Sequence, residues 1–269
     1  RSSAYRSGTL SVARSTVVLF RGESNFGNIG SMVTALADGF GRLSFDPVIV
    51  DISHGGYENR LMEIIRSRKI IAFISVSGFG LPPSPDSDAV RIFNNVDAPF
   101  LGAFLDHPFC LHDRIDMPLE NYHATFPSEH AGAFCERYIR PGGAFHHLSH
   151  GGIERATMAW ADRDIDLLLA GSLFMCPNMQ RAAWRDHGAD VEGKLNDIVD
   201  LIWLDLTRPL EGSVRQVLGE DVDFNTLFPY MKTADDYIRN AQRVDSIVAL
   251  SHLRPTVVGL GWEAYADDL

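Results

Sequence analysis

The chain has 269 residues, 45% of them hydrophobic and 22% charged, and its 24 lysines and arginines against 35 aspartates and glutamates give a formal net charge of −11. This length suits one large domain or two modest ones with a sizeable core. The charge argues against binding to nucleic acid or to an anionic membrane, because a phosphate backbone needs a positive surface. No apolar run reaches the roughly 18 residues of a membrane span. Three cysteines are an odd number for a disulfide framework, so we expect a cytoplasmic protein.

The first 150 residues alternate short apolar runs with helical patterns. Apolar runs rich in β-branched residues predict strands at 16–20, 47–52, 70–76, 99–105, 123–126 and 145–148. Apolar residues at helical spacing predict helices at 32–40, 57–69, 88–94 and 128–138. Strands alternating with helices are typical of a parallel sheet with right-handed crossovers. The predicted fold class is therefore α/β, a Rossmann-like parallel sheet with flanking helices.

The pattern changes beyond residue 152. One more strand is expected at 166–172, and helical patterns then dominate at 179–187, 191–206, 214–218 and 234–250. Pro177, Pro209 and Pro229 are expected at helix boundaries. A strand at 255–263 opens a new βα unit that the remaining residues to Leu269 do not complete, so we expect the natural protein to be longer.

Polar residues and glycines follow the predicted strands. Ligands of open parallel sheets bind beyond the carboxyl ends of the strands, where several such loops favour a polar, hydroxyl-rich ligand. The alternative is that these residues serve turn formation alone. The candidate binding residues, in chain order, are Gly27, Asn28, His54, Ser77 and His150.

The stretch from Asp106 to Asp113 concentrates titratable groups. A histidine changes protonation near neutral pH, and a neighbouring carboxylate can orient it, so Asp106 and His107 are candidate acid–base residues. A zinc site from His107, Cys110, His112 and Cys135 is conceivable. The sequence has no pair of CxxC motifs and no HExxH motif, so no metal site is predicted. Nor is there a GxSxG motif, which argues against a serine hydrolase at Ser149.

A glycine-rich turn stands near the end of the chain. Gly259, Gly261 and Ala264 satisfy the GxGxxA form of the dinucleotide fingerprint after a Val257-Val258 strand, which would bring backbone amides to a diphosphate. Without the following helix, strand and acidic residue, this indicates a phosphate-facing turn better than an NAD site. Arg239 and Arg243 are four residues apart on one helical face and could reach an anion, although a solvated or salt-bridged face is the more common use of such a pair.

Taken in order, several of these segments resemble a known family. They are Ala98–Pro108, Leu148–Gly152, Leu167–Ser172, Tyr237–Arg243 and Val257–Trp262. Across residues 45 to 263 the chain resembles the amino-terminal part of bacterial GT-B glycosyltransferases related to the spore maturation protein CgeB.

The resemblance implies two Rossmann-like domains, one that receives the acceptor and one that holds the donor. Residues 1–175 would be the acceptor-side domain, 176–254 a helical region, and 255–269 the incomplete start of the donor-side domain. The implied reaction moves a sugar from a nucleotide-diphosphate donor to a hydroxyl of a glycan, protein or small molecule, with no other cofactor. Asp106 or His107 would be the base, His54 and His150 would contact the acceptor, and Gly259 and Gly261 would offer amides to the donor. A non-catalytic α/β binding module and a truncated dinucleotide-dependent oxidoreductase remain as alternatives.

Overall fold

The computed structural model describes residues 15–23, 27–149, 162, 164–263 and 265. The chain forms two compact units, residues 1–153 (unit 1) and residues 154–269 (unit 2). His150, one of the candidate binding residues, lies outside the described residues.

Unit 1 alternates strands and helices along the described chain. Its strands are β1 (Thr16–Arg21), β2 (Asp46–Asp51), β3 (Ile70–Val76), β4 (Phe100–Ala103), β5 (Tyr122–Phe126) and β6 (Ala144–His147). Its helices are α1 (Asn28–Arg42), α2 (Tyr57–Ser67), α3 (Asp88–Asn94), the 3-10 turn η2 (Pro108–Leu111), α4 (His112–Ile115) and α5 (Glu129–Tyr138). All six predicted strands and all four predicted helices of this half are present, with ends shifted by a few residues. The short helices η2 and α4 were not predicted.

The six strands form one sheet in the order β2-β1-β3-β4-β5-β6, and every neighbouring pair is parallel. The prediction of an α/β fold with a parallel sheet and flanking helices is confirmed. Strand order reverses at β1, which pairs with β2 on one side and with β3 on the other.

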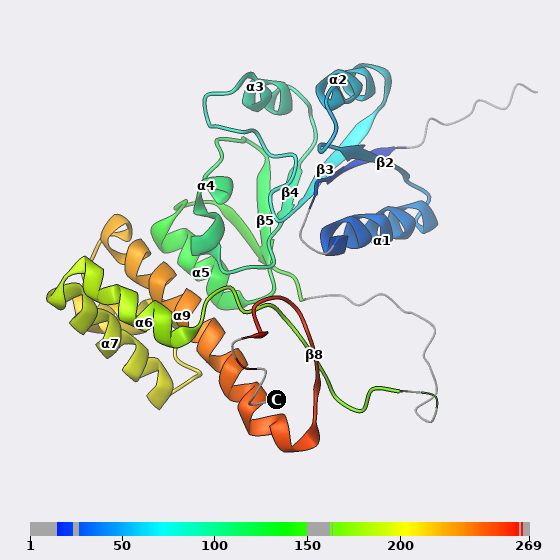
Figure 1. The fold of residues 1–269 in the computed structure, drawn as a ribbon. Coiled ribbons are helices and arrows are strands. Elements are labelled where there is room, and N and C mark those ends of the chain that lie inside the picture. The colour runs from blue at the N-terminus through cyan, green and yellow to red at the C-terminus, as the bar shows by residue number, and fades with distance from the viewer. Residues whose placement is uncertain (1–14, 24–26, 150–161, 163, 264, 266–269) are drawn as a thin grey trace, which may run out of the picture. The chain divides into compact units, whose positions relative to one another are not determined.

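Helices cover the two faces of this sheet unequally. Helix α1 packs on one face through Ile29, Val33 and Ala37, against residues such as Leu19. The other face carries the larger apolar cluster, to which α2, α3, α4 and α5 all contribute (Figure 1). At the centre of that cluster, Phe20, Phe73, Phe93 and Phe100 contact one another with ring centroids 5.0–6.3 Å apart. The alternate residues of β1 and β3 pack into the cluster on the opposite face, so both faces of these strands are buried, which explains their nearly unbroken apolar sequence.

Unit 2 is mainly helical in its described part. It contains α6 (Pro177–Ala183), the 3-10 turn η4 (Trp184–His187), α7 (Ala189–Leu204), α8 (Leu210–Leu218), α9 (Phe224–Leu250) and the 3-10 turn η5 (Ser251–Leu253). Two short strands, β7 (Leu168–Ala170) and β8 (Thr256–Val258), form a parallel pair of their own. The predicted helical region is therefore confirmed, and the strands expected at 166–172 and 255–263 are present but shorter.

One of the three proline predictions is wrong. Pro177 is the first residue of α6 and Pro209 precedes α8, as expected, but Pro229 lies inside α9. The helix begins ten residues before the predicted start, where the Asp223 carboxylate accepts the amide N–H of Thr226 at 2.8 Å. Leu227 and Met231, on either side of the proline, are fully buried, so their packing offsets the backbone hydrogen bond that the proline removes.

Within the part of the chain that the structure describes, no helix combines the length and the apolar character needed to cross a bilayer.

Candidate functional site

The carboxyl edge of the six-stranded sheet gathers most of the predicted site residues. Because all six strands are parallel, the loops that follow them emerge at one edge. In such sheets the crevice for a ligand lies where the strand order reverses, here between β1 and β3. Six of the predicted residues lie in the loops or helix start at this edge: Gly27, Asn28, His54, Ser77, Asp106 and His107.

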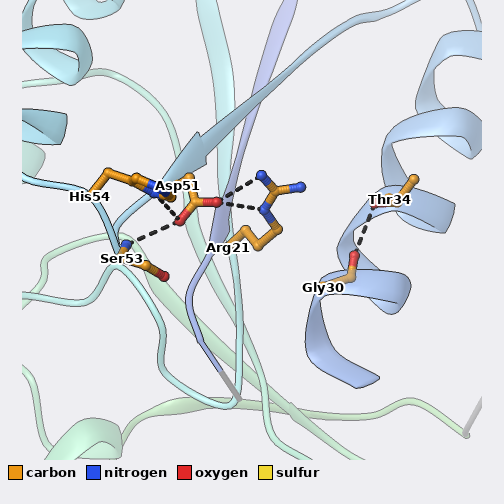
Figure 2. A network of polar contacts seen from close by, with 6 residues as sticks. All are labelled: Arg21, Gly30, Thr34, Asp51, Ser53 and His54. Carbon is orange, nitrogen blue, oxygen red and sulfur yellow. Dashed lines mark hydrogen bonds and ion pairs between the residues drawn. The ribbon is translucent and has the colours of Figure 1, made fainter. Parts of the chain in front are cut away.

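An ion-paired network stands at the ends of β1 and β2 (Figure 2). Arg21 donates from Nε to Oδ2 of Asp51 at 2.8 Å, and its Nη2 lies 2.7 Å from the same oxygen. The other carboxylate oxygen accepts the amide N–H of Ser53 at 3.0 Å and lies 3.5 Å from Nδ1 of His54. Partial burial alone would raise the pKa of Asp51, but the hydrogen bonds from Arg21 and Ser53 outweigh it and hold that pKa at about 2. Asp51 is thus a permanent anion that orients Arg21, and it is too weak a base for proton transfer near neutral pH.

The start of α1 lies against this network. Gly27, with φ 65°, precedes the helix, and the Asn28 side-chain oxygen accepts the amide N–H of Ile29 at 2.8 Å. A Cβ on Gly30 would lie 3.6 Å from Cδ of Arg21, so the arginine stem runs along the first turn of the helix. The predicted binding residues Gly27 and Asn28 therefore begin the helix whose first turn, at Gly30, contacts Arg21.

The turn after β3 has an arginine that the sequence did not reveal. Ser77 and Gly78 both have positive φ, 53° and 83°, and the guanidinium of Arg114 in α4 donates to the carbonyl of Ser77. A Cβ on Gly78 would lie 2.4 Å from Cδ of Arg114, so the close approach depends on the glycine. The two residues of this contact are 37 positions apart and belong to no local motif. A positively charged side chain thus adjoins the predicted residue Ser77.

Asp106 and His107 occupy the loop that links β4 to η2. Asp106 is exposed, whereas His107 is half-buried with its ring centroid 4.9 Å from those of Phe109 and Phe134. Nδ1 of His107 accepts the amide N–H of Phe109 at 3.4 Å. While that bond is made, Nδ1 cannot take a proton and the neutral ring presents Nε2–H as a donor. This loop thus offers an exposed carboxylate at Asp106 and a hydrogen-bond donor at His107.

Ser149, His147 and Glu129 lie near the end of β6 in the sequence of contacts serine–histidine–carboxylate that a serine-hydrolase triad has. Their hydrogen bonds, however, differ from those of a triad. His147 lies with Nε2 3.5 Å from the Ser149 hydroxyl and Nδ1 3.7 Å from Oε1 of Glu129. The same Nε2 donates to the carbonyl of Pro127 at 3.1 Å, and a nitrogen that carries a proton cannot accept one from serine. These contacts do not activate Ser149 as a nucleophile.

The remaining predicted residues, Gly259 and Gly261, belong to unit 2 and follow β8. Cβ atoms added at these positions would lie 1.9 Å from the Gly171 carbonyl oxygen and 1.8 Å from the Leu173 carbonyl oxygen. The chain after β8 therefore packs directly on the chain after β7, at positions where only glycine fits. Trp262 fixes this contact, because its indole N–H donates to the Gly171 carbonyl at 2.6 Å.

A pocket of about 440 Å³ opens in unit 2 beside the residue that follows β7. Its polar lining comes mainly from one face of α9: Arg239, Gln242, Arg243 and Ser246. Arg243 donates to the carbonyl of Ser172 at 2.8 Å, and its Nε would lie 3.8 Å from a Cβ on Gly171. Arg239 pairs with Asp235 at 2.7 Å, as expected for a salt-bridged helix face. Burial raises the pKa of Asp235, although Arg239 opposes that shift.

Among the described residues, neither the carboxyl edge of the large sheet nor the pocket of unit 2 holds a cluster of metal ligands. The described residues hold no group of three or more histidine, cysteine, aspartate or glutamate side chains arranged to bind a metal ion. Burial raises the pKa of the Cys135 thiol to about 12, which leaves it an inert core residue.

Comparisons with protein-family models, with curated proteins and with solved structures give no match for this chain.

Proposed function

We propose that this chain belongs to a glycosyltransferase that takes a sugar from a nucleotide-diphosphate donor and transfers it to a hydroxyl group. The observation that carries the proposal is the pocket of unit 2, where Arg239 and Arg243 line a space beside the ends of two parallel strands. The guanidinium of Arg243, together with that of Arg239, whose charge Asp235 partly balances, complements the negative charge of a diphosphate. The resemblance of residues 45–263 to CgeB-related GT-B enzymes supports the same assignment.

Unit 1 would receive the acceptor at the carboxyl edge of its sheet. Histidine, serine, asparagine and arginine side chains there suit a hydroxyl-rich molecule, and Asp106 stands in the same set of loops. In the reaction, the acceptor oxygen attacks the anomeric carbon and forms the new C–O bond. The bond from that carbon to the diphosphate oxygen breaks, and the acceptor proton passes to the base, for which Asp106 is the candidate. The role proposed for the arginines of unit 2 is to bind the diphosphate of the donor.

Calorimetry tests the donor site first. We expect a nucleotide-diphosphate sugar from a panel of such compounds to bind this chain, and Arg243→Ala to weaken that binding about tenfold or more, because a hydrogen bond from a charged donor contributes about 1.5–3 kcal/mol. Lys232→Ala is the matched control: it removes one positive charge from α9 at a residue that does not line the pocket. Binding of NAD(P) but of no nucleotide sugar would point instead to an oxidoreductase, and binding of neither to a non-catalytic module.

The base is tested separately. Asp106→Asn keeps the size of the side chain and removes its basicity, so sugar transfer is expected to fall by about 10²–10⁴-fold while donor binding is unchanged. Transfer at the unchanged rate would remove Asp106 from the mechanism.

A further inference from the structure

Two histidines on neighbouring strands of unit 1 contact each other directly. His123 of β5 and His146 of β6 lie near each other across the parallel pair, since His146 is aligned with Thr125. Nδ1 of His123 is 3.0 Å from Nε2 of His146, with ring centroids 5.3 Å apart and ring planes inclined by 21°. Neither residue belongs to the proposed transfer site.

A third side chain fixes the protonation of the pair. Nε2 of His123 lies 3.1 Å from Oδ1 of Asn121, an oxygen that only accepts hydrogen bonds. Nε2 of His123 therefore carries a proton, and the neutral ring presents the lone pair of Nδ1. His146 must then donate from its Nε2. An imidazole anchored by its second nitrogen to a carbonyl oxygen is the usual state of a histidine that binds a metal.

The pair is also accessible to a solvated ion. His146 is exposed and His123 half-buried. Tyr122, Ala124 and Phe126 of β5 point into the larger apolar cluster, so His123 points to the opposite face of the sheet. A net charge of −11 raises the local concentration of cations around the chain.

We propose that His123 and His146 bind a divalent transition metal ion, with Cu²⁺ and Ni²⁺ preferred over Zn²⁺. The two nitrogens now point at each other in a hydrogen bond, so a metal ion would displace the shared proton and turn both rings until their lone pairs meet at the ion. With metal–nitrogen bonds of about 2.0–2.1 Å, two nitrogens that stay 3.0 Å apart would subtend an angle of about 94° at the metal. This angle suits the right-angled ligands of Cu²⁺ and Ni²⁺ better than the tetrahedral angle of Zn²⁺. Nδ1 of His123 and Nε2 of His146 are the ligands, the proton of His146 moves to its Nδ1, and water completes the coordination.

The ion would join edge strand β6 to β5, because each strand supplies one ligand. Binding to the folded state alone stabilises it, so the melting temperature should rise with metal concentration.

The test uses the chain without an affinity tag, titrated with CuCl₂, NiCl₂ and ZnCl₂ by calorimetry and followed by electron paramagnetic resonance for copper. We expect one Cu²⁺ bound through two nitrogens, and at least a tenfold loss of affinity in both His123→Ala and His146→Ala. Asn121→Ala should lose up to about tenfold, as expected when the group that anchors a metal ligand is removed. His147→Ala is the matched control, because it removes the next imidazole of β6, which bonds to the Pro127 carbonyl.

Three results would overturn the proposal. They are unchanged copper affinity in the His146→Ala chain, an equal loss in the His147→Ala chain, or tighter binding of Zn²⁺ than of Cu²⁺. Because His146 is exposed, its replacement leaves the fold intact and the outcome interpretable even if His123→Ala disturbs β5.

Discussion

The two parallel sheets of this chain contrast in how they are stabilised. The six-stranded sheet of unit 1 has an apolar cluster on each face, and phenylalanines from several strands are buried in the larger one. The two-stranded sheet of unit 2 has a small apolar cluster built around Leu173, Ile247 and Trp262, and β7 and β8 are held together by glycine carbonyl contacts and an indole hydrogen bond. The same parallel pairing therefore depends on apolar burial in unit 1 and on close backbone approach in unit 2.

The largest expected effect tests the dependence of unit 1 on its aromatic cluster. Phe73→Ala removes a fully buried ring that contacts Phe20, Phe93 and Phe100, and should lower the free energy of unfolding of unit 1 by about 3–5 kcal/mol. Native-state hydrogen exchange measures it, since the amides of β1 and β3 should exchange faster and those of α9 should not change. Equal acceleration in both units would show that they unfold together and that the contrast between them is wrong.

A smaller effect is expected from a single methyl group in unit 2. Gly261→Ala places a Cβ 1.8 Å from the Leu173 carbonyl oxygen at a φ of 85°, so the segments that follow β7 and β8 must move apart, at a cost of at least about 1–3 kcal/mol. The fluorescence of Trp262 and the exchange of the β8 amides report the change.

Gly193→Ala is the control for that substitution. Gly193 lies within α7, and a Cβ there meets no atom within 4 Å, so alanine should stabilise the helix by about 0.5–1 kcal/mol. If Gly261→Ala is tolerated as well as Gly193→Ala, close backbone approach is not what holds the small sheet.

The smallest expected effect concerns the ion pair at the edge of the large sheet. The lowered pKa of Asp51 contributes stability that is complete above its unfolded value of about 3.9 and is lost as the pH falls toward 2. Arg21→Met should raise that pKa and reduce the unfolding free energy by less than about 1 kcal/mol above pH 5, with no difference below pH 2. NMR titration of the carboxyl group and urea unfolding between pH 2 and 6 measure both quantities, with Arg42→Met as the control. An unchanged Asp51 titration would show that Arg21 does not hold the carboxylate.

The sequence predicts well those helices and strands whose residues form a local pattern of apolar side chains. Strand β3 and helix α3 match their predicted ranges, because an apolar run and a helical repeat each lie within one element. The carboxyl edge follows from the parallel class, so the placement of His54, Ser77 and Asp106 at that edge could be predicted.

What the sequence misses depends on contacts between distant residues. Arg114 reaches the Ser77 carbonyl across 37 positions, and Arg243 reaches the carbonyl of Ser172 across 71. Neither pairing leaves a periodic signal, so the pocket of unit 2 and the arginine beside Ser77 could only be found in three dimensions. The prediction of a helix boundary at Pro229 is wrong for the same reason. The burial of Leu227 and Met231 in the folded chain outweighs the tendency of proline to end a helix.

The reversal of strand order at β1 also has a kinetic consequence. Since every neighbouring pair in the large sheet is parallel, no two strands can join through a tight hairpin, and β1 cannot pair with β3 until residue 70 and those after it have been synthesised. Closing such long loops before their apolar contacts form slows folding, so we expect refolding of unit 1 on the millisecond-to-second scale. During synthesis, the side of β1 that pairs with β3 stays open until β3 has left the ribosome, even after β2 has paired with the other side.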